Sequence, residues 1–275
     1  MTDQLVNPRF PRSSKYNPEW MLEGPFGGNA VWLAEWLSES LELEPGMRVL
    51  DLGCGRAKSS VFLANEFDVQ VWATDLWINP TENQQRIEAA HFNDQVFPIH
   101  ADARALPFAA EFFDAIVCVD AYSYFGTDDM YLNYLAQFVK PHGPIGIAGA
   151  GLVREFKSGV PSHLERFWSQ SCWCLHTSDW WKNHWDRTGV VSVNVAETMP
   201  RGIDVWKQWN GAMQDPVQWF VDTLDEDDGQ YLGYVRMVAS RYEDVKLEEY
   251  CWPNQSTTWP VEFIRHHVFR SQTPN

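Results

Sequence analysis

The chain has 275 residues, 45% of them hydrophobic and 21% charged, a balance typical of a folded globular protein and not of a disordered one. Its formal net charge of −16 repels phosphate backbones and therefore argues against nucleic acid as a partner. Five scattered cysteines, the lack of any apolar run of the roughly 18–20 residues that cross a bilayer, and an N-terminus without an apolar signal segment predict a cytoplasmic protein with no membrane span.

A regular alternation of strands and helices is expected in the middle of the chain. Short apolar runs alternate with helix-forming segments, at 47–53, 69–76, 96–102, 113–122 and 143–151. This alternation is typical of parallel strands joined by helices. Further along, the sequence predicts a helix over 178–189, a sixth strand over 190–199 and a seventh strand over 260–270.

These elements predict an α/β fold, with a Rossmann-like, seven-stranded, mostly parallel sheet and helices on both faces. We expect an N-terminal helical segment or lid over 1–46 and a core over 47–199. A helical, tryptophan-rich cap is expected over 200–258, followed by the last core strand and a tail over 259–275. Most of the fifteen tryptophans should fill the core, whereas one or two facing a cationic ligand would form an aromatic wall.

Acidic residues lie at or near the ends of the first four predicted strands, namely Asp51, Asp75, Asp102 and Asp120. Ligands of open parallel sheets bind beyond this edge, and four such residues in succession are hard to explain as helix caps alone. Gly53 and Gly55 let the backbone turn tightly and approach a ligand. Asp75 is placed to accept hydrogen bonds from ribose hydroxyls. Asp102 can accept from an adenine amino group, and Ala103 offers its N–H to the ring.

The glycine turn departs from two familiar phosphate-binding motifs. A dinucleotide-binding turn has a third glycine where this chain has Lys58. A P-loop has glycine before its Lys-Ser pair, where this chain has Ala57. The turn therefore suits a nucleoside ligand without a pyrophosphate.

The segments "VLDLGCG", "ATDL", "ADARALPF" and "FDAIVCVDAYSYF" resemble, in order and spacing, the motifs of class I S-adenosylmethionine-dependent methyltransferases. The resemblance covers about 47–151, with weaker agreement through residue 199, and is nearest to small-molecule enzymes of the ubiquinone-biosynthesis and cyclopropane-synthase-like types. It implies S-adenosylmethionine as cofactor, with the methionine part held between Asp51 and Gly55. The cofactor-binding residues predicted in this way are Asp51, Gly53, Cys54, Gly55, Asp75, Leu76, Asp102, Ala103 and Asp120.

The resemblance further implies in-line methyl transfer to a small-molecule acceptor, helped by proximity and desolvation. "DAYSYFGTDD" departs from the Asn/Asp-Pro-Pro-Tyr pattern of nucleic-acid and glutamine N-methyltransferases. This difference argues against nucleic acid and glutamine as substrates. The aromatic content and acidity weakly favour N-methylation of an amine. Candidate catalytic residues are Asp120, Tyr122 and Tyr124, and candidate substrate-binding residues are Tyr16, Trp20 and Tyr124.

Two other functions stay open at this point. A nicotinamide-dependent oxidoreductase would use the same fold and Asp75, and a non-catalytic binder of S-adenosylmethionine would keep the same motifs. "CWCLH" places Cys172, Cys174 and His176 at alternate positions, where a soft metal or arsenite is a minor alternative; no metal site is predicted. An exposed part of the cap would favour a homodimer.

Overall fold

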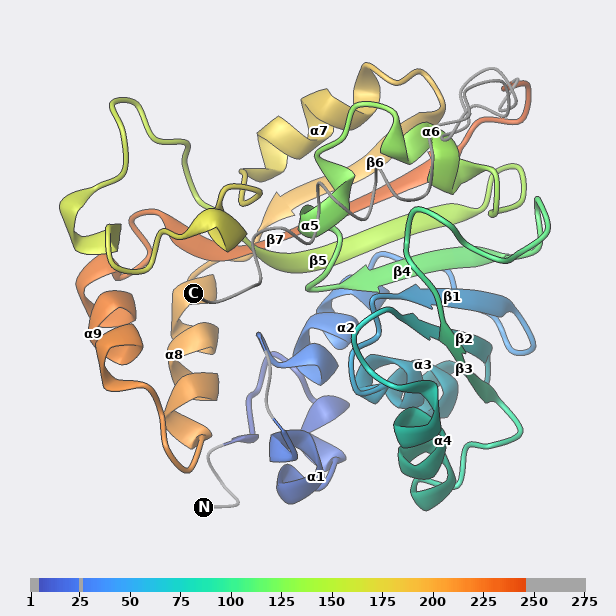
Figure 1. Ribbon diagram of the computed structural model, residues 1–275, viewed down its shortest axis with the longest axis horizontal. Coiled ribbons are helices and arrows are strands. Elements are labelled where there is room, and N and C mark those ends of the chain that lie inside the picture. The colour runs from blue at the N-terminus through green and yellow to red at the C-terminus, as the bar shows by residue number, and fades with distance from the viewer. Residues whose placement is uncertain (1–4, 25–26, 246–275) are drawn as a thin grey trace, which may run out of the picture.

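A computed structural model describes residues 5–24 and 27–245 of the chain (Figure 1). A single seven-stranded sheet runs through this part, in the order β3-β2-β1-β4-β5-β7-β6. The strands are β1 (Arg48–Leu52), β2 (Gln70–Asp75), β3 (Val96–His100), β4 (Ala115–Val119), β5 (Pro144–Leu152), β6 (Val191–Thr198) and β7 (Leu232–Arg241). β1 to β5 pair in parallel, and β7 lies antiparallel between β5 and β6. The predicted Rossmann-like, mostly parallel sheet is confirmed.

The helices cover both faces of this sheet because alternate residues of each strand point to opposite sides. Val49 of β1 packs into one apolar cluster with α2 (Ala30–Ser38) and α3 (Lys58–Phe67). Leu50 and Leu52 pack into a second cluster with α6 (Tyr131–Ala136) and α7 (Ser178–Asp186). The remaining α-helices are α1 (Pro18–Leu22), α4 (Pro80–Ala89), α5 (Ser123–Gly126), α8 (Gly202–Ala212) and α9 (Gln218–Asp227).

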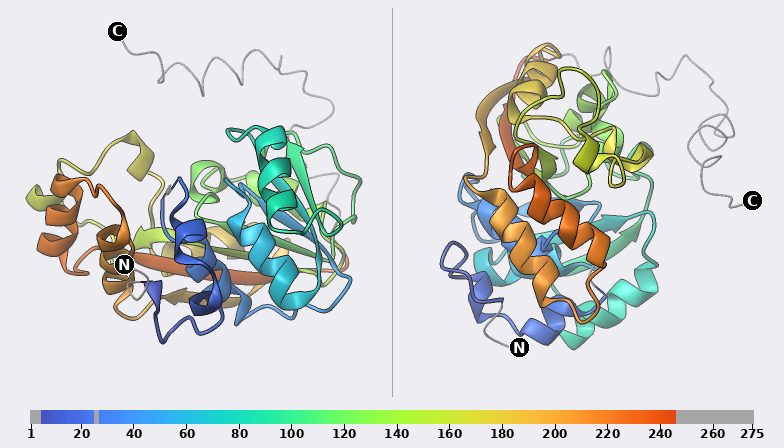
Figure 2. Two further views of the ribbon diagram at one scale, coloured as in Figure 1. Left: turned by 90° about the horizontal axis from the view of Figure 1, so that it is seen from below. Right: turned by 90° about the vertical axis from the view of Figure 1, so that its left-hand side faces the viewer.

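A cap of α8 and α9 lies at one end of the sheet, next to the N-terminal segment (Figures 1 and 2). Trp209 of α8 packs edge-on against Trp32 of α2, with ring centroids 6.3 Å apart, and Trp206 stacks on Tyr234 of β7 at 5.2 Å. Trp32 is fully buried, as are Trp181 and Trp185 of α7. Large aromatic side chains thus join the cap to the sheet, as the composition predicts.

The seventh strand differs from its predicted place. The expectation of a wholly helical cap over 200–258 is wrong at Leu232–Arg241, which form β7. Nearly all of β7 is buried on both faces, so the alternation that marks a half-exposed strand is missing, and Arg236 interrupts the apolar run. The segment 260–270, predicted as the last strand, lies outside the described residues.

Within the described ranges, no helix combines the length and the apolar composition that a membrane crossing needs.

Candidate active site

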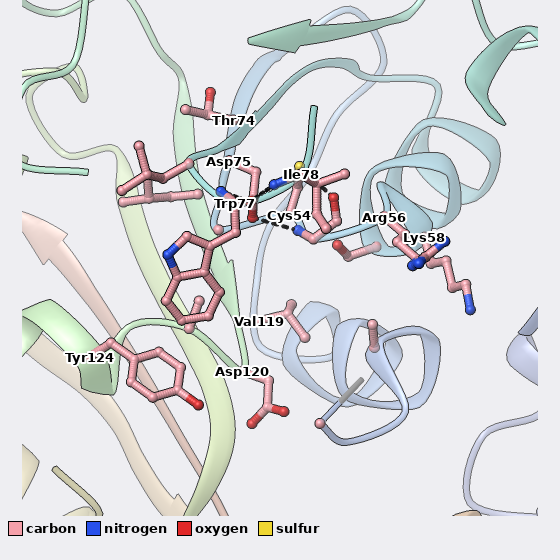
Figure 3. A pocket seen from close by; sticks show the side chains of 18 of the residues that line it. Cys54, Arg56, Lys58, Thr74, Asp75, Trp77, Ile78, Val119, Asp120 and Tyr124 are labelled. Carbon is pink, nitrogen blue, oxygen red and sulfur yellow. Dashed lines mark hydrogen bonds between the residues drawn. The ribbon is translucent and has the colours of Figure 1, made fainter. Parts of the chain in front are cut away.

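A cavity of about 440 Å³ opens at the carboxyl ends of the first four strands of the sheet (Figure 3). Its volume lies in the range of about 300–1,000 Å³ typical of small-molecule sites. Open parallel sheets bind ligands at this edge, at the point where the strand order reverses. Here that point lies between β1 and β4, because β2 and β3 follow on one side of β1 and β4 and β5 on the other. Its lining includes most of the predicted cofactor-binding residues, namely Gly53, Cys54, Gly55, Asp75, Leu76, Asp102, Ala103 and Asp120.

The turn between β1 and α3 forms the floor of the cavity. Gly53 and Gly55 have φ angles of +73° and +53°, in the region that strongly favours glycine. A Cβ on Gly53 would overlap the side chain of Ala121, so this glycine allows the turn to pack against the end of β4. A Cβ on Gly55 would meet no protein atom within 4 Å. Gly55 itself lines the cavity, so we expect this open space to be available to a ligand.

Asp51 lies below the turn and does not line the cavity. Its Oδ2 accepts hydrogen bonds of 2.6 Å from the hydroxyls of Ser59 and Ser60 in the first turn of α3. Asp51 thus fixes the helix against the strand, and its predicted direct contact with the cofactor does not fit this position. Complete burial raises the pKa of its carboxyl to about 6.

Asp75, at the end of β2, ties the glycine turn to the loop that follows its own strand. Its Oδ2 accepts from the Gly55 N–H at 2.9 Å, and its Oδ1 accepts from the N–H groups of Trp77 and Ile78 at 2.7 and 2.8 Å. A carboxylate has about four acceptor positions. Backbone N–H groups therefore use three of these acceptor positions, and roughly one position stays open. Two ribose hydroxyls would need two positions.

Asp102 and Ala103 form the wall beyond β3. The Asp102 carboxylate accepts from both the backbone N–H and the Nε of Arg104, at 2.9 and 3.1 Å. The carbonyl of Ala103 accepts from the hydroxyl of Tyr131 at 2.9 Å, which fixes the loop from the buried side. The backbone geometry of this wall is thus set by its own hydrogen bonds.

Asp120 presents a rigidly held carboxylate to the cavity. Its backbone has a φ of +56°, uncommon for a residue other than glycine. One oxygen accepts from the Gly28 N–H at 2.8 Å and the other from the Ala150 N–H at 3.0 Å. A Cβ on Gly27 would overlap this carboxylate. Burial raises the pKa of the Asp120 carboxyl above its ordinary value.

Two aromatic side chains stand at the same cavity. The rings of Trp77 and Tyr124 lie 5.8 Å apart, and these side chains are 57% and 49% exposed (Figure 3). Burial, with the nearby Asp120 charge, raises the pKa of the Tyr124 phenol to about 12. The phenol is therefore protonated near neutral pH, so it can donate a hydrogen bond but is a poor general base.

Three predicted site residues lie elsewhere. Tyr122 is only 2% exposed and packs against Trp181 and Trp185 in the core, so its prediction as a catalytic residue is wrong. It is the N-cap residue of α5, directly after β4, and it belongs to the apolar core and not to the cavity lining. Tyr16 stacks on Trp20, and neither lines the cavity, so their prediction as substrate-binding residues does not fit either.

Other residues line the cavity that sequence reasoning did not assign to it, including Asn29, Arg56, Lys58, Trp77 and Trp209. Asn29 is 2% exposed, and its Oδ1 caps α2 by accepting from two backbone N–H groups at 3.0 and 3.2 Å. Its Nδ2 has no hydrogen-bond partner in the described part of the chain. The lid predicted over 1–46 includes Asn29 and the "GGNA" stretch, but nothing local in the sequence singles out the Asn29 side chain as a cavity residue.

Cys172, Cys174 and His176 have separate local partners. The thiols of the two cysteines donate to the carbonyls of Phe167 and Ser171 at 3.4 and 3.2 Å. The imidazole of His176 stacks on Trp180, with ring centroids 3.7 Å apart. No three His, Cys, Asp or Glu side chains within residues 5–24 and 27–245 lie close enough to share a metal ion.

Residues 49–143 match a family model described as a methyltransferase domain. This part of the chain is thus similar to a methyltransferase domain, in agreement with the motifs of the sequence. Methyltransferase GfsG of Streptomyces halstedii is 30% identical over 117 residues, which are 42% of this chain and 42% of that protein. Demethylmenaquinone methyltransferase of Corynebacterium efficiens is 32% identical over 125 residues, 45% of this chain and 50% of that protein. The chain spans about half the length of these curated relatives or less.

A solved structure agrees with the fold of the methyltransferase domain. Phosphoethanolamine N-methyltransferase 2 of Haemonchus contortus, in complex with S-adenosyl-L-methionine, superposes with a TM-score of 0.63 at 17% identity. The match covers 88% of this chain and 60% of that one. It therefore extends beyond the methyltransferase domain to most of the remaining strands and helices.

The burial of Asp51 generates a testable pH dependence of stability. Because its pKa rises from 3.8 to about 6 on folding, the folded state holds a proton that the unfolded state loses near pH 4. The contribution of this group to stability should be fully present below pH 4 and fall by about 3 kcal/mol as the pH rises through 6. Asp51→Asn removes the titrating group.

The free energy of unfolding of both proteins, measured in urea from pH 4 to pH 8, checks this. We expect the Asn variant to gain stability relative to the native protein as the pH rises. A difference that does not change over this range would mean that Asp51 keeps an ordinary pKa.

Proposed function

We propose that this chain is an S-adenosylmethionine-dependent methyltransferase that acts on a small-molecule acceptor, with the nitrogen of an amine as the accepting atom. The observation that carries the proposal is the cavity floor. There, an open glycine at Gly55 and the carboxylate of Asp75 lie beside each other at the end of a parallel sheet. This is where a methyltransferase domain would hold its donor.

Different residues of the cavity suit different parts of S-adenosylmethionine. Asp102 and Ala103 would border the adenine, and the remaining acceptor position of Asp75 would take one ribose hydroxyl. Gly55 leaves space for the methionine part over the turn. The buried, unpartnered amide of Asn29 and the guanidinium of Arg56 supply donors for a carboxylate.

Positioning carries most of the expected catalysis. S-adenosylmethionine supplies a methyl group on a sulfonium, which leaves as a neutral thioether. The acceptor nitrogen would form its bond to the methyl carbon as the sulfur–carbon bond breaks, and the proton released from nitrogen would pass to Asp120 or to water. Holding two reactants in line is worth up to roughly 7–11 kcal/mol in favourable intramolecular reactions. The raised pKa of Asp120 makes it a stronger proton acceptor than an ordinary carboxylate.

The two other functions predict different binding behaviour. A nicotinamide-dependent oxidoreductase would bind a dinucleotide across a turn where Lys58 stands in place of the third glycine. The Lys58 ammonium donates to the carbonyls of Met21 and Glu23, so it closes this side of the turn. A non-catalytic binder would hold the donor without turnover. A cytoplasmic location, a homodimer and the exclusion of nucleic acid stay predictions.

A pair of glycine variants tests the donor site. Gly55→Ala places a methyl group in the open space over the turn, and Gly46→Ala is its control. Gly46 also has a positive φ, of +81°, and open space around it, but it precedes β1 and does not line the cavity. Both variants should lose about 1 kcal/mol of stability to backbone strain.

Calorimetric titration with S-adenosylhomocysteine separates the two variants. Gly55→Ala should weaken binding at least tenfold, because its Cβ fills the space that the ligand needs, and Gly46→Ala should bind as the native protein does. Equal affinities in all three proteins would place the donor elsewhere.

The activity itself is tested with isotope-labelled methyl donor and four acceptor pools: amines, phenols with carboxylates, thiols with arsenite, and halides. We expect labelled product and release of S-adenosylhomocysteine with the amine pool. Turnover with another pool alone would overturn nitrogen as the accepting atom, and the proposed methyltransferase activity would stand. Donor binding without turnover in any pool would favour the non-catalytic binder, and binding of a nicotinamide dinucleotide in its place would favour the oxidoreductase.

A further inference from the structure

One side of the cavity is not used by the donor contacts proposed above. The contacts proposed for the donor come from the glycine turn, Asp75, Asp102 with Ala103, Asn29 and Arg56. They do not include Asp120, Tyr124 or Trp77, and in Figure 3 the rings of Trp77 and Tyr124 lie next to each other. Phe125 and Trp209 also line the cavity. The cavity therefore combines one carboxylate with several aromatic rings.

The Asp120 carboxylate lacks a countercharge from the protein. In the described part of the chain no lysine, arginine or histidine forms a salt bridge with it, and its two hydrogen bonds come from neutral backbone N–H groups. Each oxygen keeps roughly one acceptor position. A partly buried charge without a partner is unfavourable, so the cavity should favour a cation over a neutral ligand of the same shape.

The position of this carboxylate is fixed before any ligand arrives. Two backbone N–H groups hold its oxygens, and the missing side chains of Gly27 and Gly149 leave it the room it occupies. Preorganisation of this kind lowers the entropy that binding loses. The carboxylate can therefore discriminate between ligands by charge and not only by shape.

The aromatic pair adds a second preference for cations. Trp77 and Tyr124 reach the cavity from different elements, the loop after β2 and helix α5, and their rings meet at 5.8 Å. Ring faces attract ammonium groups, tryptophan most strongly. In Figure 3 the indole of Trp77 lies next to the ring of Tyr124, whose hydroxyl points toward the side of Asp120.

From this juxtaposition we infer that Asp120, Trp77 and Tyr124 form the acceptor subsite, and that it recognises an alkylammonium group. The inference rests on the proposed function, since it names the substrate class of the same site. Asp120 would pair with the charged nitrogen, and the two rings would contact its alkyl substituents. The nitrogen would pass one proton to Asp120 or to water before methyl transfer, because only the neutral amine has the lone pair that forms the new bond. A neutral hydroxyl or a carboxylate would gain neither interaction.

Two ligands of the same shape test the subsite by charge alone. Choline carries a quaternary ammonium, and 3,3-dimethylbutan-1-ol replaces that nitrogen with carbon. Their affinities for the protein are measured by calorimetry in the presence of saturating S-adenosylhomocysteine. We expect choline to bind about tenfold more tightly than the neutral alcohol, on the order of the cation–π and ion-pair terms combined.

Three variants assign this preference to residues. Asp120→Asn should abolish most of the preference for choline, because it removes the negative charge. Asparagine keeps the size of the side chain and tolerates a positive φ, so the backbone should not be strained. Trp77→Leu should reduce the preference about threefold. Trp173→Leu is its matched control, because Trp173 is 65% exposed and does not line the cavity. Trp77 is also largely exposed, so its variant should fold even if that of Asp120 does not.

The outcomes separate this inference from the proposed function. Failure to bind S-adenosylhomocysteine would remove the methyltransferase proposal itself. Tight binding of S-adenosylhomocysteine, with equal affinities for choline and the alcohol, would overturn only the alkylammonium subsite. A preference for choline that survives both Asp120→Asn and Trp77→Leu would place the cation in another part of the cavity.

Discussion

The cavity depends on one carboxylate that holds two loops together. Asp75 accepts hydrogen bonds from the N–H of Gly55, in the turn after β1, and from two N–H groups of its own loop. Hydrogen bonds to an ionised acceptor are about twice as strong as those between neutral groups. The floor of the cavity and the placement of Trp77 at its edge are therefore set by the same side chain. Loss of this carboxylate would leave three N–H groups unpaired and would release both loops.

Negative charge is concentrated under and around this floor. The three carboxylates accept hydrogen bonds from different groups: Asp51 from two hydroxyls, Asp75 from three backbone N–H groups and Asp120 from two backbone N–H groups. The second oxygen of Asp51 is buried and has no partner in the described part of the chain. The charge of Asp75 contributes to the raised pKa of Asp51. Such a group of carboxylates favours positively charged ligands. It suits both a sulfonium donor and an ammonium acceptor, and it disfavours an anionic acceptor placed near Asp120.

Much of the cavity can be predicted because its determinants are local. Apolar runs locate the strands, and the residue that follows each run must lie at the ligand edge of a parallel sheet, which is where Gly55, Asp75, Asp102 and Asp120 are found. The position of β7 escapes such reasoning because burial on both faces removes the alternation. Asn29 and Trp77 cannot be placed from the sequence. Their positions depend on how α2 docks on the sheet and how the loop after β2 folds back, which are tertiary contacts.

The cavity extends beyond the residues that match the family model. Residues 49–143 contain every residue proposed for the adenine and the ribose, but Gly27, Asn29 and Trp209 lie outside them. The N–H groups that hold the Asp120 carboxylate come from Gly28 and Ala150, also outside the match. The geometry of the carboxylate that would meet the acceptor is therefore set partly by segments outside the matched residues. The matched part of the chain thus holds Asp120, Trp77 and Tyr124 themselves, whereas the segments on either side of it fix the position of the Asp120 carboxylate.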